Sequence, residues 1–289
     1  MSKLKRMGVS DRVFYACIMV IAIGALIIAL YPIYFIIIAS VSNSNMIIPR
    51  DISFYGYQKI LERADLWVGY RNTILYTVAG TILNLAVTLP AAYVLAQPEF
   101  SGRKVIMTMF VITMYFSGGM VPTYMLVKTL HLTNTSLIMI IMGALSVYNL
   151  IITRTFFESS IPKELQEAAE LDGCSHFRYF GQIVLPLSKA VVSVITLYYA
   201  VGHWNDFFTA LLYLNKDVYQ PLQTILRNIL LSNQAMAGTT GAGEGSYAQQ
   251  FADQIKFAVI IVSTVPVLCI YPFIQKYFEK GVMIGAVKG

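Results

Sequence analysis

The sequence is poor in charged residues. Only 12% of its 289 residues are Asp, Glu, Lys or Arg, about half of the roughly 25% found in soluble domains. Hydrophobic residues make up 57%, and the mean hydropathy is +0.64. This composition excludes a soluble globular protein, and it also excludes disorder, which requires low hydrophobicity and high charge. The class that remains is an all-α polytopic membrane protein.

Residues for bond chemistry and metal binding are also scarce. The three cysteines are odd in number and form no C-x-x-C pair, so no disulfide framework is expected. The three histidines have no metal-ligand spacing, and no Ser/His/Asp series or pair of carboxylates indicates hydrolysis. The Gly-rich run AMAGTTGAGEGS (235–246) lacks the Lys-Ser or Lys-Thr of a P-loop. We therefore expect no enzyme activity, no metal and no cofactor in this chain.

Six apolar runs are long enough to cross a bilayer, which requires about 20 residues as a helix. They lie at about 13–40, 72–96, 105–127, 135–157, 189–214 and 255–277. An even number of spans places both termini on one side. More Lys and Arg residues fall in the segments on that side, which predicts that the termini are cytoplasmic. Because the basic residues lie mostly at the ends of the apolar runs, we explain the net charge of +6 by membrane topology and not by nucleic-acid binding.

This topology divides the chain into a short tail, a six-span domain with two long loops, and a second tail. The expected parts are the cytoplasmic N-terminus 1–12, the six-span transmembrane domain 13–277 with its cytoplasmic loop 158–188 and extracytoplasmic loop 215–254, and the cytoplasmic tail 278–289.

The loop 158–188 is too polar to span and carries a helical pattern. Ser160 is a candidate N-cap, Pro162 suits the first turn, and Gly173 suits a left-handed C-terminal position. One face of the intervening helix holds Leu165, Ala168, Ala169 and Asp172. Small alanines on an exposed face would let another protein approach closely. The alternative is an amphipathic helix on lipid, although its acidic polar face disfavours anionic lipid.

Seven residues of this loop follow the pattern E-A-A-x3-G-x9-I-x-L-P, which resembles the hallmark of transmembrane subunits of ATP-binding-cassette (ABC) importers. They are Glu167, Ala168, Ala169, Gly173, Ile183, Leu185 and Pro186. The resemblance implies the transmembrane fold of a type I ABC importer. It also implies that the segment, with Asp172, is a coupling helix that docks on a cytoplasmic ATPase.

Further stretches resemble the sugar branch of that family. The end of the chain, KGVMIGAVKG, is similar to the tail of the smaller permease of maltose-type importers, which implies contact with the ATPase dimer through Gly285, Ala286, Val287, Lys288 and Gly289. The stretches 114–135 and GHWNDFF (202–208) resemble permeases of complex-oligosaccharide importers. By position, Ser246 and Tyr247 of the outer loop resemble a segment that probes the binding protein.

The resemblance also implies the partners of the chain. These are a second homologous permease, two ABC ATPase subunits that bind the ATP and Mg, an extracytoplasmic sugar-binding protein or lipoprotein, the sugar itself and membrane lipid, with no nucleic acid. The expected location is the bacterial cell membrane.

Polar and aromatic residues within spans three to five are candidates for a sugar pathway, because sugars stack on aromatic rings and bond neutral polar groups. They are Tyr115, Gly118, Gly119, Tyr148, Asn149, Tyr199, Trp204, Asn205 and Asp206. For each, ordinary packing or an interface position is the alternative. The Ser117-Gly118-Gly119 run with Pro122 should break span three, and Asn84 should form an interhelical hydrogen bond.

Competing functions predict features that the sequence carries weakly. An ion-gradient-driven carrier would need intramembrane carboxylates and paired broken helices, whereas Asp206 is nearly the only charge within the spans. A membrane adaptor or receptor would not need polar groups in spans three to five. A permease for peptides or amino acids remains an alternative within ABC importers.

Overall fold

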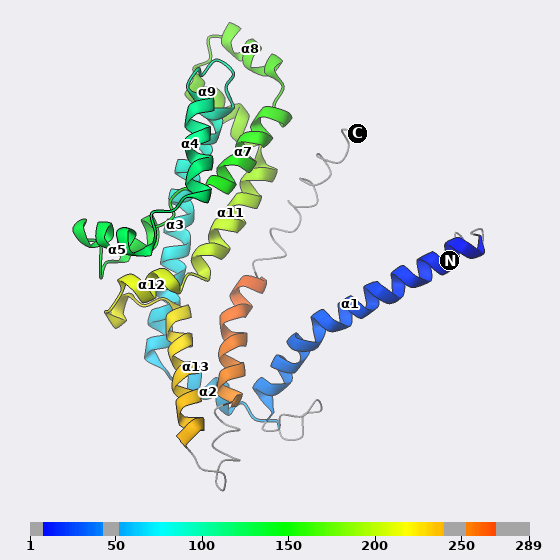
Figure 1. Ribbon diagram of the computed structural model, residues 1–289, viewed down its shortest axis with the longest axis vertical. Coiled ribbons are helices and arrows are strands. Elements are labelled where there is room, and N and C mark those ends of the chain that lie inside the picture. The colour runs from blue at the N-terminus through cyan, green and yellow to red at the C-terminus, as the bar shows by residue number, and fades with distance from the viewer. Residues whose placement is uncertain (1–7, 43–51, 240–252, 270–289) are drawn as a thin grey trace. The chain divides into compact units, whose positions relative to one another are not determined.

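The computed structural model describes residues 8–42, 52–239 and 253–269 (Figure 1). The chain divides into two compact units, one of Met1–Arg63 with Asn228–Thr264 and one of Ala64–Arg227 with Val265–Gly289. Within the described ranges the regular structure is helical apart from one isolated bridge between Ser42 and Ile52. The prediction of an all-α chain is therefore confirmed for these residues.

The first unit contains the first predicted span. The helix α1 (Val9–Val41) has a mean hydropathy of 2.8 in its most apolar window, and no residue of that window is buried. The short helix α2 (Tyr55–Leu61) follows it, and Tyr57 forms a 2.8 Å hydrogen bond with Ser40 near the end of α1. The same unit holds most of a helix at 253–269, from which Gln254 donates to the carbonyl of Ser53.

The second unit is built around α3 (Ala64–Ala96), a single helix of 33 residues. It packs against α6 (Ser136–Ile141), α7 (Val147–Ser160) and α11 (Lys189–Trp204). Glycines on α3 allow this close packing, since a Cβ added at Gly80 would lie 2.4 Å from the ring of His203. Small residues serve this purpose in membrane helices, where van der Waals contact replaces the hydrophobic effect between helices.

Three of the predicted spans are broken helices. Span three consists of α4 (Arg103–Tyr115) and α5 (Met120–Thr129), bent by 112° at the predicted Gly118-Gly119 break, where Gly119 has φ +89°. Span four, expected to be continuous, breaks between α6 and α7, where Gly143 has φ +72°. Span five, also expected to be continuous, ends its long helix at Trp204 and resumes as α12 (Phe208–Tyr213).

The count of six spans stays a prediction. Within the described residues, two helices are long and apolar enough to cross a membrane, or four if each of two bent pairs forms one span. One pair is α4 with α5. The other joins His176–Leu187 to α11 at an angle of 83°.

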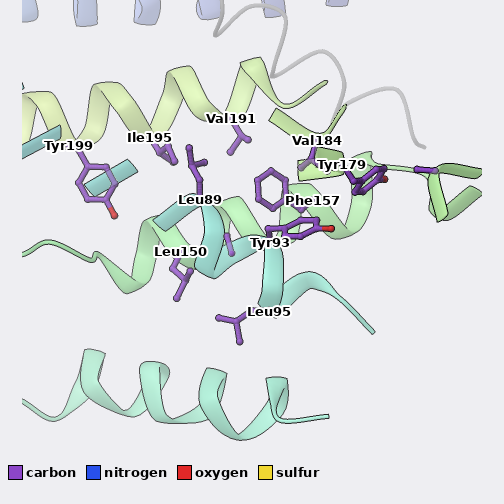
Figure 2. Packing of buried hydrophobic residues seen from close by; sticks show 12 residues of the cluster. Leu89, Tyr93, Leu95, Leu150, Phe157, Tyr179, Val184, Val191, Ile195 and Tyr199 are labelled. Carbon is purple, nitrogen blue, oxygen red and sulfur yellow. The ribbon is translucent and has the colours of Figure 1, made fainter. Parts of the chain in front are cut away.

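Short elements between α7 and α11 form one end of the second unit (Figure 1). They are α8 (Lys163–Leu171), α9 (His176–Tyr179), the π-helix η2 (Phe180–Val184) and α10 (Leu185–Leu187). A 3-10 turn, η3 (Asp217–Tyr219), precedes α13 (Leu222–Thr239) farther along the chain. A buried cluster ties the short elements to the long helices, with Tyr93 from α3, Phe157 from α7, Tyr179 from α9 and Val191 from α11 (Figure 2).

Candidate functional site

A fixed turn connects α8 and α9. Gly173 adopts φ +70°, its N–H donates to the carbonyl of Glu170 at 3.0 Å, and the N–H of Cys174 donates to the carbonyl of Ala169 at 2.9 Å. This pair of bonds is a Schellman motif, in which a left-handed glycine satisfies the last carbonyls of a helix. Ser175 then caps α9 by accepting from the N–H of Arg178. The predicted helix–Gly–helix element is confirmed.

The start of α8 differs from the prediction. Ser160 is not its N-cap but the last residue of α7, and Pro162 occupies the cap position. The residue before a proline is driven out of the helical region, and Ile161 is extended. One helix therefore has to end at Ser160 before the next can begin.

The two alanines of the motif differ in exposure. Ala169 is 8% exposed and packs into the core cluster, whereas Ala168 is exposed together with Glu167 and Asp172. The expectation that both alanines lie on an exposed face is therefore wrong for Ala169. Ala169 instead holds α8 against the rest of the unit, because a small side chain lets the helix backbone approach the core.

The second half of the motif also anchors the element. Ile183 and Leu185 are partly buried against the core cluster, and Pro186 lies exposed within α10. Of the predicted coupling residues, Glu167, Ala168, Asp172 and Gly173 therefore form the outward surface of the helix–turn–helix made by α8 and α9. Leu171 and Phe177, 90% and 91% exposed on either side of the turn, belong to it as well. Neither residue was among those predicted to contact the ATPase, although two large apolar residues beside a predicted turn are a usable signal.

Arg154 links the ends of two long helices near α8. Its Nε donates to the carbonyl of Leu95 at 3.0 Å, and its guanidinium also contacts the carboxylate of Glu158 at 2.6 Å. The carbonyl of Leu95 lies in the last turn of α3, which has no helical N–H to pair with it. This arginine therefore joins α7 to the end of α3.

Four of the predicted pathway residues line one cavity of about 820 Å³. Tyr148 and Asn149 reach it from α7, Tyr199 from α11, and Asp206 from the break that follows α11. The rings of Tyr148 and Tyr198 face each other with centroids 6.5 Å apart. The cavity also includes Ser146 and His203, which were not among the residues predicted from the sequence.

A buried hydrogen-bond network supports one wall of this cavity. Asn84 donates to the carbonyls of Gly143 and Ala144, both at 2.9 Å, so its carbonyl oxygen must accept the 2.7 Å bond from Nε2–H of His203. The predicted interhelical role of Asn84 is confirmed. The hydroxyl of Tyr199 bonds Thr88 at 2.7 Å and accepts from the N–H of Ser146 at 3.1 Å.

The remaining candidates lie elsewhere. Tyr115, Gly118 and Gly119 are exposed at the break between α4 and α5 and do not line this cavity. Trp204 is buried beside Tyr70, and the side-chain amide of Asn205 donates to the carbonyl of Val201 in α11, the helix that it follows. Neither lines the cavity, so both predictions gain no support from the geometry. Ser246, Tyr247 and the tail 285–289 lie outside the described residues.

The element and the cavity occur in a chain with clear relatives. The profile of the family described as binding-protein-dependent transport system inner membrane component matches residues 64–284. The polygalacturonan/rhamnogalacturonan transport system permease protein YtcP of Bacillus subtilis (strain 168) is 40% identical over 86% of this chain and 86% of its own length. Protein LplC of the same organism is 38% identical over 97% of this chain and 96% of its own length.

A solved structure has the same fold. It belongs to a bacterial ABC transporter involved in the import of the acidic polysaccharide alginate. The matched chain is 31% identical to this one, with a TM-score of 0.84, and the match covers 94% of this chain and 99% of that chain.

Proposed function

Because the chain belongs to the family of binding-protein-dependent transport system inner membrane components, we propose that it forms half of the translocation pathway of an ATP-driven oligosaccharide importer. A family member of this kind is a non-catalytic transport subunit. The carbohydrate part of the proposal is supported by relatives whose names refer to polygalacturonan, rhamnogalacturonan and alginate.

The observation that carries the mechanism is the rigid element around Gly173. Ala169 and Tyr179 fix its two helices to the core cluster, and the Schellman turn fixes their mutual angle. A force applied to the outward surface therefore moves the ends of α7 and α11 rather than deforming a loop. If an ATPase docks there, closure of its dimer would move these helices and shift the pathway between its inward-open and outward-open states.

The cavity beside α7 and α11 is the surface of the pathway in this proposal. Its tyrosines offer ring faces for stacking, and Asn149 and Ser146 offer neutral polar groups, which suits the alternating apolar and hydroxylated faces of sugars. A peptide permease would use the same subunit architecture. Uptake of labelled oligosaccharide but not of labelled peptide would therefore distinguish a sugar permease from a peptide permease. An ion-gradient carrier would transport in the absence of ATP.

The remaining parts of the proposal concern topology and assembly. The chain would span the bacterial cell membrane six times with both termini in the cytoplasm, which places loop 158–188 inside and loop 215–254 outside. It would pair with a second permease, since one such chain encloses only half of a pathway. Two ATPase subunits would bind ATP and Mg, and an extracytoplasmic binding protein would deliver the sugar.

Replacement of Gly173 by valine tests the coupling role. A residue with a Cβ at φ +70° costs about 1–2 kcal/mol, and a β-branched residue costs more, so the turn should open while the spans stay inserted. We expect binding-protein-stimulated ATP hydrolysis and transport to fall severalfold in the assembled importer. Gly181→Val is the matched control, because a Cβ at Gly181 meets open space and the φ there is not positive. Unchanged transport in Gly173→Val would overturn the coupling role.

A further inference from the structure

A second cavity, separate from the proposed pathway, lies where the helix–turn–helix joins the long helices. It has a volume of about 290 Å³. Its lining comes from the end of α3 and the start of α4, from the end of α7, and from α8, α9 and η2. Anything bound there would touch both the element proposed to receive force and the helices proposed to transmit it.

Two tyrosine hydroxyls at this cavity have no hydrogen-bond partner. Tyr93 and Tyr179 are 8% and 3% exposed, and their ring centroids lie 6.4 Å apart. Among the described residues neither hydroxyl is paired, although both residues line the cavity. Figure 2 shows both hydroxyl ends directed away from the aliphatic side chains of the core cluster. A buried donor left unpaired is unfavourable, so a ligand oxygen that accepts from it gains binding energy.

The charge of the lining is positive. Arg103 and Lys163 both line the cavity, and neither forms an ion pair with a residue in the described ranges. The one carboxylate of the lining, that of Glu158, is 2.6 Å from the guanidinium of Arg154 and is neutralised by it. The cavity therefore presents two hydroxyl donors and two cations that are unpaired among the described residues. Its own carboxylate, Glu158, is already paired, and that of Glu170, which lies near both tyrosines without lining the cavity, accepts from Gln166 at 3.1 Å.

We propose that this cavity binds a phosphate group, held by Arg103, Lys163 and the hydroxyls of Tyr93 and Tyr179. Phosphate oxygens accept from all four groups, and charge-assisted bonds from arginine and lysine are the strongest type available to such a ligand. The volume lies at the lower limit of small-molecule pockets, so it suits a phosphate with a small substituent rather than a nucleotide. The sources with this chemistry are a soluble phosphate ester and the headgroup of an anionic lipid. The side of the membrane on which the site opens rests on the proposed topology; the binding chemistry does not.

Phosphate-dependent thermal stability of the assembled importer tests the site. The complex is studied without nucleotide in an uncharged detergent, and its melting temperature is measured against increasing inorganic phosphate. Phosphate bound by the ATPase subunits contributes equally in every variant, so the differences between variants report this cavity. We expect the midpoint of the phosphate response to rise at least about tenfold in Arg103→Gln/Lys163→Gln, since each change removes a charge-assisted bond. The control is Lys104→Gln, which removes an exposed cation next to Arg103 that does not line the cavity.

A second variant separates binding from folding. Tyr93→Phe/Tyr179→Phe keeps both rings in the core and removes only the two unpaired hydroxyls. Its melting temperature without phosphate should equal or exceed that of the wild type, while its phosphate response weakens. An equal phosphate response in the wild type and in both double variants would overturn the proposal and assign the space to water, even if the coupling test at Gly173 succeeds.

Lipid composition then identifies the source of the phosphate. The same titration is repeated in nanodiscs of phosphatidylglycerol. If the lipid headgroup fills the site, the midpoint for inorganic phosphate rises in these discs for the wild type and not for the cation double variant. If a soluble ester fills it, the midpoint in the discs matches that in detergent. Either result supports the phosphate site, provided that the variants differ from the wild type in detergent.

Discussion

Gly80→Ala is the sharpest test of the helix packing behind the proposed pathway. A Cβ at position 80 would lie 2.4 Å from both Cε1 and Nε2 of His203, whereas ordinary contacts between such atoms are about 3.5–4.0 Å. The imidazole would have to retreat by roughly 1 Å. It cannot do so and keep the 2.7 Å bond from its Nε2 to Asn84, because Asn84 is held by two backbone carbonyls.

The magnitude follows from three contributions. Overpacking costs about 1–3 kcal/mol, and loss of the bond to Asn84 adds about 0.5–1.5 kcal/mol. Replacing a glycine within a helix by alanine stabilises the helix by about 0.5–1 kcal/mol. We expect a net destabilisation of about 1–3 kcal/mol, which is visible as a lower unfolding temperature of the assembled importer in detergent.

Two comparisons isolate the clash. Gly202→Ala, on α11 with no atom within 4 Å of the added Cβ, should gain the helix contribution without the clash and be as stable as the wild type or more so. In the background of His203→Ala the ring is absent, so adding Gly80→Ala should not lower the unfolding temperature any further. If Gly80→Ala and Gly202→Ala unfold at the same temperature, or if His203→Ala does not relieve the defect, the packing described for α3 and α11 is wrong.

Three further changes have outcomes set by the contacts. Tyr199→Phe leaves the buried hydroxyl of Thr88 and the half-buried N–H of Ser146 without their partner and should destabilise the importer by about 1–3 kcal/mol in thermal unfolding. Tyr198→Phe should leave the unfolding temperature unchanged, as no described hydrogen bond is lost. Arg154→Gln should lower the unfolding temperature more than Glu158→Gln, because the arginine also donates to a backbone carbonyl. The i,i+4 ion pair alone contributes about 0–1 kcal/mol to stability, and equal unfolding temperatures would contradict this prediction. Deletion of 285–289 should lower ATP turnover more than the yield of purified complex, and wild-type turnover would remove the tail from the proposed ATPase interface.

Local signals predicted the features that depend on local rules. The length and apolarity of the first two runs predicted α1 and α3, although α3 begins at Ala64, before the predicted start of its span. The glycines at 118 and 119 predicted the break in span three, and Gly173 predicted a left-handed turn, because only glycine adopts positive φ without steric cost.

Features that depend on the partner of a side chain could not be predicted in the same way. The helical pattern placed Ala168 and Ala169 on one face, but which side of that face meets the core depends on where Tyr93 and Phe157 lie. His203 was considered only as a metal ligand and dismissed, since its role requires a glycine and an asparagine on a helix more than a hundred residues earlier in the chain. Which of the nine pathway candidates share one cavity depends on the same kind of long-range pairing, so the sequence could not single out Tyr148, Asn149, Tyr199 and Asp206.

The break in span four and the polar residue in span two are two halves of one arrangement. A helix interrupted within a membrane leaves carbonyls that no lipid can satisfy, so such breaks survive only where another part of the protein supplies donors. Here the break exposes the carbonyls of Gly143 and Ala144, and the amide of Asn84 pairs with both. From the sequence, Asn84 was predicted to form an interhelical hydrogen bond, but no break was predicted at Gly143. A side-chain amide buried within a predicted span, such as that of Asn84, is therefore a signal for a broken helix opposite it, here the break between α6 and α7. The same amide also indicates His203, because an asparagine that donates twice still has an oxygen that must accept.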